Sequence, residues 1–458
     1  EIFDDQTKLG GFMRSQVPSF RLPEEILNTE IGYITNLGNI TTRTSHYVSD
    51  IRDLLAQDYD AVFVGCGAPR GRDLDLPGRA AGDKTIHVGI EWLAGVVWGH
   101  VEKIGKKVLV LGGGNTAMDC CRTARRLGGE DVKVIVRSPR AEMKASEWEI
   151  EDAVKEDIPI IENHTPREFV IEDGRLVGML FDKVQPVYDE NGRRRLEPTG
   201  EEPVFFACDE VLLAIGQQNA FPFIDENSGI EFTERGLPVL DPVTLQSTVE
   251  RVFFGGDAAF GPANIIIAVE HGHQAAISID LLCRGKNLHD RPHPQVKLAG
   301  QKLGFHDWIY DSHVTEDDRQ QVPTVAKAKT LRDRLVEVEL GFSQPTSKTE
   351  AKRCLNCDVQ TVFDYTLCIE CDACADICPT NCINFIENDE EAVLREQLIV
   401  PARNQSQDLY VSDTLPTGRV MVKDENVCLH CGMCAERCPT SAWEMIKFFY
   451  KSAQASQL

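Results

Sequence analysis

The sequence predicts an α/β chain of parallel sheets and covering helices, followed by a small α+β C-terminal domain. Two patterns carry this prediction. Between residues 60 and 285, short apolar runs that end in glycine or a charge alternate with helical stretches: YDAVFVGCG, KKVLVLGGG, DVKVIVR, CDEVLLAIG and VERVFFGGD. Such runs are typical of buried parallel strands. After residue 353, eleven of the sixteen cysteines are clustered at spacings of two or three residues.

Length and charge limit the number of domains and the kinds of partner that this chain can have. A chain of 458 residues is too long for one ordinary core, so we expect two or three domains. The formal net charge of -24 disfavours nucleic acid and anionic membrane surfaces and suits basic protein patches, although surplus acids could equally serve solubility alone. No uncharged apolar run approaches a membrane span, and the first residues show no leader pattern. We therefore expect an untargeted, cytoplasmic protein.

Two four-cysteine runs, CIECDACADICP and CLHCGMCAERCP, share the pattern CxxCxxCxxxCP. This pattern holds [4Fe-4S] clusters, and in two-cluster proteins the fourth cysteine of each run ligates the other cluster. Zinc is disfavoured because its sites pair two CxxC units. Such clustering also points to metal ligation in a reducing cytoplasm. If the fourth cysteines are exchanged in this way, one cluster is bound by Cys368, Cys371, Cys374 and Cys438. The other cluster is bound by Cys428, Cys431, Cys434 and Cys378.

The C-terminal module resembles bacterial two-cluster ferredoxins over residues 364 to 445. It departs from compact ferredoxins in the 49 residues between Cys378 and Cys428, which include a long polar insertion at roughly 388–426. Three further cysteines lie near the first run: Cys354, Cys357 and Cys382. They could help to hold another cluster or metal with ligands from a partner, or they could be remnants, and we favour remnants slightly.

A dinucleotide site is predicted at KKVLVLGGGNTAMD. A buried strand leads into Gly112, Gly114 and Ala117 in GxGxxA spacing, with Asn115 and Thr116 at the start of the next helix. The glycines allow a tight turn and let the backbone approach a pyrophosphate at the helix N-terminus. A glycine turn alone would be weak evidence, but the strand, helix and following strand all fit.

The strand DVKVIVR then ends in Arg137 rather than an acid. An arginine there accommodates a 2′-phosphate, so NADPH is favoured slightly over NADH. The alternative is a solvent-exposed arginine, and the neighbouring Ser138 keeps that alternative open.

Three ordered segments carry a family resemblance: GGGNTAMDCCRTARRLGGEDVKVIVR, AIGQ and FFGGDAAFGPANIIIAVEHGHQAA. Over residues 4 to 285 the chain resembles the glutamate synthase small subunit, the flavin half of dihydropyrimidine dehydrogenase, and the large subunit of NADH-dependent ferredoxin:NADP oxidoreductase. The resemblance implies a flavoprotein with two dinucleotide-binding domains. We expect an FAD domain at 1–103 and 218–288, an NAD(P)H domain at 104–217, a linker at 289–348 and a ferredoxin-like domain at 349–458.

The resemblance also implies which residues contact the cofactors. Asp4 would accept from the adenosine ribose, Arg21 of FRLP lies in the segment along the flavin, and the backbone amides of Asn264 and Ile265 would lie near its ring. The remaining implied cofactor residues are Gly10, Gly11, Cys66, Gly67, Ile215, Gly216, Gly256 and Asp257. The family's first GxGxxG strand and helix precede the segment that is residue 1 here. We expect this beginning to be missing or to lie in a segment not shown.

The leading hypothesis is an oxidoreductase subunit that passes electrons between NAD(P)H, FAD and two [4Fe-4S] clusters. By resemblance to anaerobic subunits, its partner would be ferredoxin, a flavin/iron-sulfur NADH dehydrogenase-like subunit or a formate dehydrogenase-like subunit, and electron bifurcation is compatible with this layout. No catalytic side chain is required. One alternative is an electron-relay or scaffold subunit with inactive nucleotide domains. A thiol-disulfide reductase is disfavoured because Cys120 and Cys121 are adjacent on a helix and Cys66 is alone.

Overall fold

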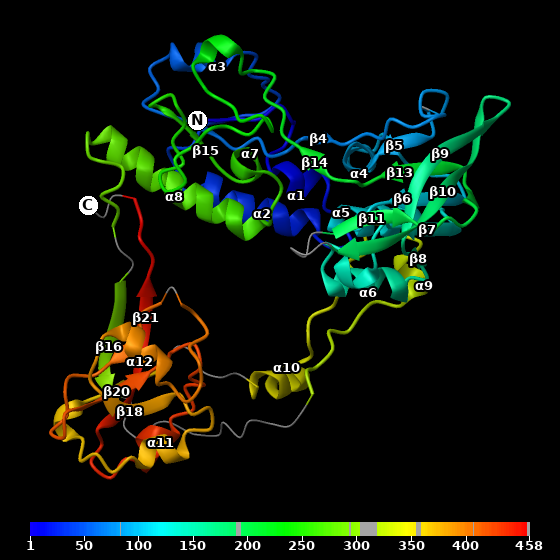
Figure 1. Cartoon of the computed structure of the whole chain (residues 1–458). Coiled ribbons are helices and arrows are strands. Elements are labelled where there is room, and N and C mark those ends of the chain that lie inside the picture. Colours follow the sequence, from blue (N-terminus) through cyan, green and yellow to red (C-terminus); the bar gives the residue numbers. More distant parts are fainter. Residues whose placement is uncertain are drawn as a thin grey trace.

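The computed structural model describes residues 1–458 except 83, 189–193, 293–294, 303–317, 354–358, 406 and 456–458, with backbone alone at 194, 295–302, 359 and 447–450. Figure 1 shows two α/β lobes, formed by the blue to green part of the chain, and a C-terminal module in orange and red. The predicted combination of parallel α/β lobes with a small α+β module is confirmed.

The second lobe is built on a parallel sheet with strand order β5-β13-β6-β7-β8. Its strands are β5 (Ile86–Val88), β6 (Lys107–Leu111), β7 (Asp131–Ile135), β8 (Ile160–Ile161) and β13 (Glu210–Leu213). The helices α4 (Gly89–Val97), α5 (Asn115–Arg126) and α6 (Glu147–Lys155) pack on it. The strand order reverses at β6, because β7 follows on one side and β13 returns on the other. In such sheets ligands bind at this switch point.

An antiparallel sheet is inserted between β8 and β13. It consists of β9 (His164–Glu172), β10 (Arg175–Tyr188), β11 (Arg194–Pro198) and β12 (Val204–Ala207). The buried rings of Phe169 and Phe181 pack with Leu109 and Leu213 of the parallel sheet. The insertion therefore shares a core with the lobe that carries it.

The first lobe contains two separate parallel pairs, β1 (Ile2–Phe3) with β2 (Thr42–Arg43) and β3 (Val62–Val64) with β15 (Val252–Phe254). Its helices are α1 (Gly11–Ser15), α2 (Glu24–Thr35), α3 (Ile51–Leu55), α7 (Asp257–Phe260) and α8 (Ile265–Cys283). The chain crosses between the lobes twice, where β4 (Arg70–Gly71) pairs with β14 (Gln217–Gln218). The expected boundary at residue 104 is therefore too late, since β5 already belongs to the second sheet.

Helix α8 is long and apolar enough to span a membrane, with a mean hydropathy of 1.2 over a stretch that is 22% buried. A single helix of this kind is weak evidence, because helices of soluble proteins pass the same test. The helix also carries Glu270 and Asp280 within its length. Its His271 and Gln274 bond to the backbone of Gly256 and to the side chain of Arg291. Helix α8 is therefore part of the first α/β lobe.

The C-terminal module contains two antiparallel sheets. One has the order β16-β21-β17, from β16 (Gln295–Lys302), β17 (Val359–Phe363) and β21 (Trp443–Lys451), and the other has the order β18-β20-β19, from β18 (Ile383–Glu387), β19 (Tyr410–Val411) and β20 (Arg419–Lys423). Short helices α11 (Ala373–Ile377) and α13 (Met433–Arg437) follow the first cysteines of each run, and α12 (Glu391–Glu396) lies between the runs. The long polar insertion is thus a folded part of the module, with buried Leu394, Val420 and Val422.

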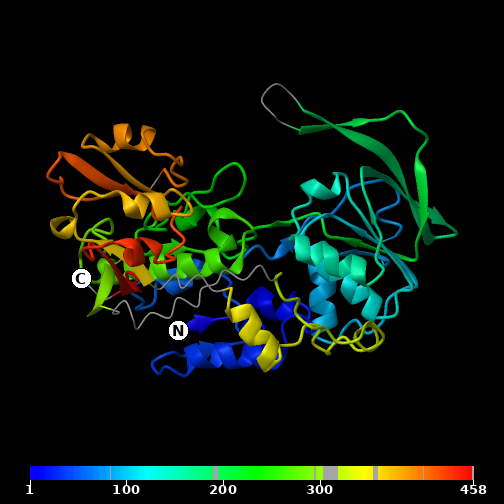
Figure 2. The same cartoon turned by 90° about the horizontal axis from the view of Figure 1, so that it is seen from below.

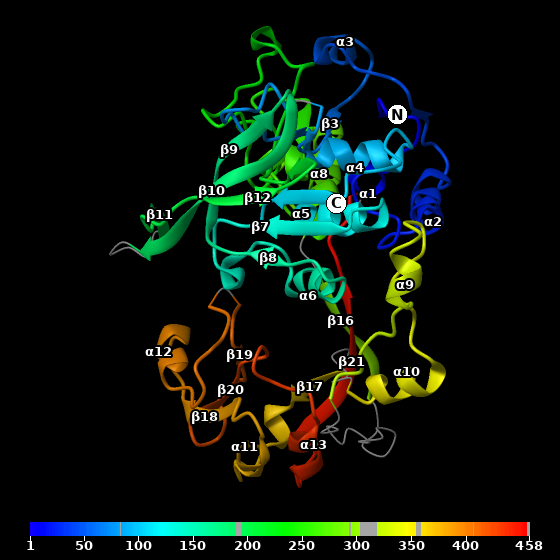
Figure 3. The same ribbon diagram turned by 90° about the vertical axis from the view of Figure 1, so that its right-hand side faces the viewer.

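The segment expected as a linker does more than connect. Its β16 joins the sheet of the C-terminal module, and its α9 (Lys327–Thr330) places Lys327 Nζ 2.6 Å from the Asp157 carboxylate of the second lobe. Further on, Val338 N donates to Phe20 O at 3.0 Å. Figures 2 and 3 show the yellow segment with α9 and α10 (Gln344–Ala351) running from the second lobe toward the module. The segment 289–348 therefore connects the two parts and also pairs with each of them.

Candidate cofactor sites

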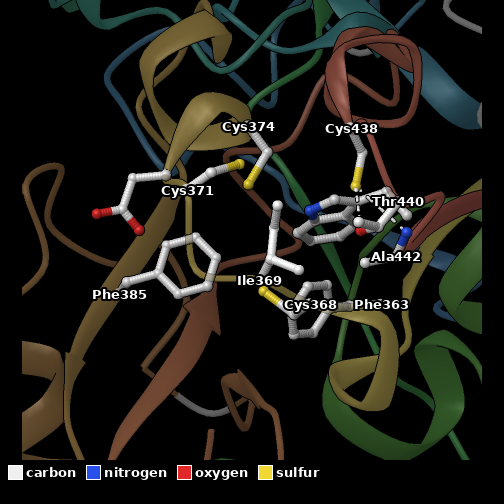
Figure 4. Close-up of a pocket in the computed structure, with 11 residues that line it drawn as sticks. Phe363, Cys368, Ile369, Cys371, Cys374, Phe385, Cys438, Thr440 and Ala442 are labelled. Atoms are coloured by element: carbon white, nitrogen blue, oxygen red, sulfur yellow. Dashed lines mark hydrogen bonds between the residues drawn. The ribbon is translucent and has the colours of Figure 1, made fainter. Parts of the chain in front are cut away.

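One pocket of the C-terminal module brings together cysteines of both runs. Cys368, Cys371 and Cys374 of the first run line it together with Cys438 of the second. Figure 4 shows these four cysteines around the same space. The rest of the wall is mainly apolar and includes Phe363, Ile369, Phe385, Ala442 and Trp443.

A second pocket mirrors the first. Cys428, Cys431 and Cys434 line it with Cys378 of the other run. Its wall also contains Cys382, whose Sγ lies 3.5 Å from Cys378 Sγ. The structure therefore puts Cys382 at a pocket rather than apart from one. Cys354 and Cys357 lie outside the described residues.

The two runs repeat the same local backbone. Glu370 and His430 both have positive φ, at 55° and 54°, and their amides donate to Cys368 Sγ at 3.4 Å and Cys428 Sγ at 3.3 Å. Each loop thus turns back on its own first cysteine and directs backbone N–H groups at sulfur. Ala442 N also donates to Cys438 Sγ, at 3.2 Å.

The pocket chemistry fits a sulfur-rich metal group. Four thiols converge on the first pocket, which is the ligand count of a [4Fe-4S] cluster, and the second pocket has four such thiols together with that of Cys382. The indole Nε1 of Trp443 is buried at the first pocket and faces the Cys374 thiol, where its hydrogen bond opposes the rise in pKa that burial causes. It would also donate to a ligand sulfur of a cluster bound there.

The second pocket carries a buried charge. Lys423 is 0% exposed, and its ammonium contacts Thr361 Oγ1 at 2.6 Å and Glu425 Oε1 at 2.9 Å. The thiol of Cys382 and the Lys423 ammonium both lower the pKa of the Cys428 thiol, to about 6, against the effect of burial. Three possible metal-binding atoms lie within 4.8 Å of one another: a carboxylate oxygen of Glu425, Cys428 Sγ and a ring nitrogen of His430.

The glycine turn after β6 lies at the switch point of the parallel sheet. Gly112 has φ +136°, and a Cβ there would lie 2.1 Å from Ala214 O beyond β13. A Cβ on Gly114 would meet nothing within 4 Å, and Gly114 is the N-cap residue of α5, which has no side-chain cap. Uncapped amides facing open space form an anion site, so the turn fits a dinucleotide pyrophosphate.

The residues around this turn are held in place by the lobe. Asn115 Oδ1 accepts from Ser146 N at 2.9 Å and ties α5 to the start of α6, while Ala117 is fully buried and Thr116 is half-buried in the first turn. Ile215 and Gly216 follow β13, and Gly216 O accepts from Arg72 N at 3.0 Å. Arg137 is exposed just beyond β7, whereas Ser138 is buried.

Two further turns meet in the first lobe. Because β3 and β15 are parallel neighbours, the segments 65–67 and 255–257 leave the same edge of the pair. Gly256 has φ +59°, and its amide donates to His271 Nδ1 at 3.1 Å. Asp257 Oδ1 accepts from Ala263 N at 3.0 Å, and burial raises the pKa of this carboxyl.

The other expected flavin contacts have the following positions. Asn264 caps α8 through Ile267 N, at 2.9 Å, and Ile265 is exposed in the first turn. Cys66 is exposed, and Gly67 has φ +72°. Asp4 follows β1 and accepts from Gln6 N at 2.8 Å, while Gly10 and Gly11 lead into α1 with φ +132° and +51°. Flavin contact by these residues stays a prediction.

Arg21 has partners that the sequence did not suggest. Its guanidinium donates to Asp119 of α5 at 2.6 Å and to Glu149 of α6. Phe20 beside it is buried, with the Arg126 guanidinium 3.8 Å from the ring centre. The segment therefore joins the first lobe to the helices of the second, and its contact with a flavin stays a prediction.

Several structural residues were missed because no motif marks them. They are Asn219, which donates to the carbonyls of Asp257 and Ala258, together with His271, Lys423 and Trp443. Cys120 and Cys121 are both 0% exposed, and burial raises the pKa of the Cys120 thiol. These adjacent buried thiols give no support to a thiol-disulfide reductase.

Comparison with known proteins agrees with this arrangement. A family model described as pyridine nucleotide-disulphide oxidoreductase matches residues 18–272, and a 4Fe-4S dicluster domain matches residues 367–442. These domains bring FAD, a nicotinamide nucleotide and two [4Fe-4S] clusters. The predicted kinds of cofactor are thereby confirmed, while the residues that bind each cofactor stay predictions.

Among curated relatives, the NADP(+)-dependent formate dehydrogenase subunit beta of Moorella thermoacetica is 35% identical over 78% of this chain and 50% of its own length. The glutamate synthase [NADPH] small chain of Halomonas elongata is 31% identical over 61% of both chains, which confirms the resemblance. The chain thus spans about half the length of the first relative.

Among solved structures, FprA of Mycobacterium tuberculosis in complex with NADPH matches with a TM-score of 0.51 at 15% identity, over 62% of this chain and 76% of FprA. At this identity the match shows the fold alone, which is that of the two α/β lobes. The chain therefore belongs to the pyridine nucleotide-disulphide oxidoreductase family and continues into a 4Fe-4S dicluster domain.

Proposed function

We propose that this chain is a cytoplasmic electron-transfer subunit that passes electrons between NADPH, FAD, two [4Fe-4S] clusters and a partner protein. The observation that carries the proposal is the mixed lining of the two cysteine pockets, in the same chain as an open glycine turn at the switch point of a parallel sheet. A nicotinamide supplies a hydride, a flavin handles two electrons and can release them singly, and each cluster carries one.

The cluster ligands are proposed as two crossed sets. Each pocket has three cysteines from one run and the last cysteine of the other run. The backbone amides of Glu370, His430 and Ala442 already donate to cysteine sulfurs, so they would stabilise thiolate charge on the ligands. The indole of Trp443 would add a donor at the first pocket.

At the nucleotide site, the chain's own groups bind and orient the dinucleotide. The first-turn amides of α5 hold the pyrophosphate, and the absence of a side chain at Gly114 lets it approach. The exposed guanidinium of Arg137 pairs with the 2′-phosphate of NADPH. At the flavin, the turn at Gly256 and Asp257 and the start of α8 would hold the cofactor by backbone and carboxylate contacts.

The partner is proposed to be another redox subunit. The relative from Moorella thermoacetica is named as the beta subunit of a formate dehydrogenase, which supports a formate dehydrogenase-like partner, and ferredoxin is the alternative partner that the family resemblance implies. The net charge of -24 favours a partner with a basic docking surface. Apolar side chains are exposed beside both cysteine runs, namely Ile369, Leu429 and Met433, and would contribute to docking.

The oxidoreductase proposal is tested on anaerobically purified protein. We expect flavin absorbance that is bleached by NADPH faster than by NADH, followed by the electron paramagnetic resonance signals of reduced clusters. The relay or scaffold alternative would be favoured if the protein had intact cluster spectra but bound no flavin. It would also be favoured if neither nucleotide reduced the bound flavin.

The crossed ligand sets are tested by paired cysteine variants. The double variant Cys371→Ser/Cys438→Ser removes two ligands from one proposed set, so it should keep about four of about eight irons. The matched variant Cys371→Ser/Cys378→Ser removes one ligand from each set and should damage both clusters. The reverse pattern of iron content and cluster spectra would show that each run ligates its own cluster.

A further inference from the structure

We infer that the buried Lys423 makes the second cluster, held by Cys428, Cys431, Cys434 and Cys378, the more easily reduced of the two. This inference rests on the ligand sets of the proposed function. It ranks the two clusters by reduction potential, which the symmetric cysteine pattern alone does not do.

The lysine is fixed at the pocket by its surroundings. It is the last residue of β20, its side chain is 0% exposed, and it lines the second pocket. Its ammonium contacts Thr361 Oγ1 and Glu425 Oε1, and lies 5.8 Å from the ring centre of Trp443. An ammonium has three donors, so these two contacts leave one N–H for an acceptor such as a sulfur in the pocket.

The first pocket has a different charge. Among its lining residues there is no lysine or arginine, and the one charged side chain is the acid Asp372. Arg419 pairs with Asp372 at 3.1 Å from outside the lining. The two pockets therefore share their cysteine geometry but differ in the sign of the charge that lines them.

This difference changes how each cluster accepts an electron. Reduction adds negative charge to a group that already carries four thiolates, and a nearby cation stabilises the more negative state. Charge interactions are stronger in a buried site than in water, so the Lys423 ammonium raises the reduction potential of the second cluster. At the first pocket the pairing of Asp372 with Arg419 leaves no comparable buried cation in the lining.

Glu425 opposes the lysine and supplies a control. Its carboxylate lies 2.9 Å from Lys423 Nζ and within 4.8 Å of Cys428 Sγ, but it does not line the pocket. We therefore expect the ammonium to dominate at the cluster. Removing either charge should move the potential of the second cluster, in opposite directions.

The experiment measures the midpoint potential of each cluster by redox titration followed by electron paramagnetic resonance. Lys423→Met should lower the potential of the second cluster, and Glu425→Gln should raise it. We expect each variant to change the equilibrium constant for electron exchange between the clusters by about tenfold or more. The signal of the second cluster is identified in Cys371→Ser/Cys438→Ser, which keeps only that cluster.

The outcomes separate this inference from the proposed function. Unchanged potentials in variants that retain about eight irons, or shifts of the same sign in both, would overturn the role of Lys423 while leaving the ligand sets intact. If Lys423→Met loses a cluster, the order of the two midpoint potentials in the natural protein decides, and a higher potential at the first cluster would overturn the inference. Loss of both clusters from Cys371→Ser/Cys438→Ser would count against the crossed ligand sets themselves.

Discussion

The two glycines of the dinucleotide turn have different physical reasons. Gly112 has a left-handed backbone, and a Cβ there would overlap Ala214 O at 2.1 Å. Gly114 has an ordinary φ of -102°, and its missing side chain leaves open space before α5. The first glycine therefore serves the fold, and the second serves the approach of a ligand.

Alanine at each position separates these roles. Gly112→Ala adds both a clash and backbone strain, so it should lower the free energy of unfolding by about 1–3 kcal/mol. Gly114→Ala should leave that free energy within about 0.5 kcal/mol, yet weaken NADPH binding by about tenfold or more. Urea unfolding and NADPH titration measure the two effects.

Gly341→Ala is a suitable control, since a Cβ there also meets nothing within 4 Å and Gly341 lies outside the glycine turn. It should change neither stability nor NADPH binding. Unimpaired nucleotide binding by Gly114→Ala would argue against a pyrophosphate at this turn.

At the residue scale, sequence reasoning worked where chemistry is local. Within each run, the spacing of three cysteines matches the short loop and helix that direct them to one pocket, and the pocket linings support the expected exchange of Cys378 and Cys438, while cluster ligation itself stays a prediction. Lys423 and Trp443 were not predicted. Lysines are usually exposed, and both residues reach the pockets only through the pairing of β20 and β21 with distant strands.

At the scale of elements, the segment at Phe20 and Arg21 connects the lobes by charge. Arg21 lies between Asp119 of α5 and Glu149 of α6, and Arg122 and Arg126 both pair with Glu156. Burial raises the pKa of Asp119 to about 7, and the attraction of Arg21 opposes this shift. The contact between the lobes should therefore respond to pH.

The sign follows from proton linkage. Folding raises the pKa of Asp119, so the folded state binds its proton more tightly than the unfolded state does, and stability falls as pH rises from about 4 to about 7. Asp119→Asn removes this titration. The melting temperature of the natural protein relative to this variant should decrease across that pH range and stay level above it.

Melting curves by circular dichroism at several pH values measure this difference. Asp131→Asn is the control, because Asp131 is exposed at the start of β7. A difference between Asp119→Asn and the natural protein that does not vary between pH 4 and 7 would contradict the assignment.

The strands β6, β7 and β13 of the parallel sheet and the β3/β15 pair were predictable because each is a continuous apolar run, whereas the short edge strands β5 and β8 were not predicted. The inserted sheet β9–β12 was not predicted, since its strands mix polar and apolar residues and depend on antiparallel pairing with one another. The strand β16 was taken for linker for the same reason. Its place follows from pairing with β21, at the far end of the chain.

At the scale of the whole molecule, the chain has separate cores. The parallel sheet has its own apolar cluster around Val108, Val134 and Leu212. The core of the C-terminal module instead contains cysteines of both runs, including Cys374 and Cys434, beside Met421 and Trp443. The proposed clusters would thus sit inside the second core, whereas the first core needs no metal.

Removal of iron should therefore unfold one part and spare the other. Metal binding is coupled to folding where the ligands form the core, so a chelator-treated protein should lose amide protection in β17, β18, β20 and β21. Strands β6, β7 and β13 should keep theirs. Hydrogen exchange followed by mass spectrometry measures both regions in one sample.

Reconstitution with iron and sulfide should restore protection in the module and leave the parallel sheet unchanged. If the module kept full protection without iron, the apolar contacts around Trp443 and Met421 would be sufficient to hold it, and the pockets would be preformed. If β6 and β7 lost protection as well, the cores would be coupled, most directly through the contacts of Lys327 with Asp157 and of Val338 with Phe20. We expect neither, because the Lys327–Asp157 pair is exposed and the buried bond between Val338 and Phe20 belongs to the connecting segment, not to the core of the module.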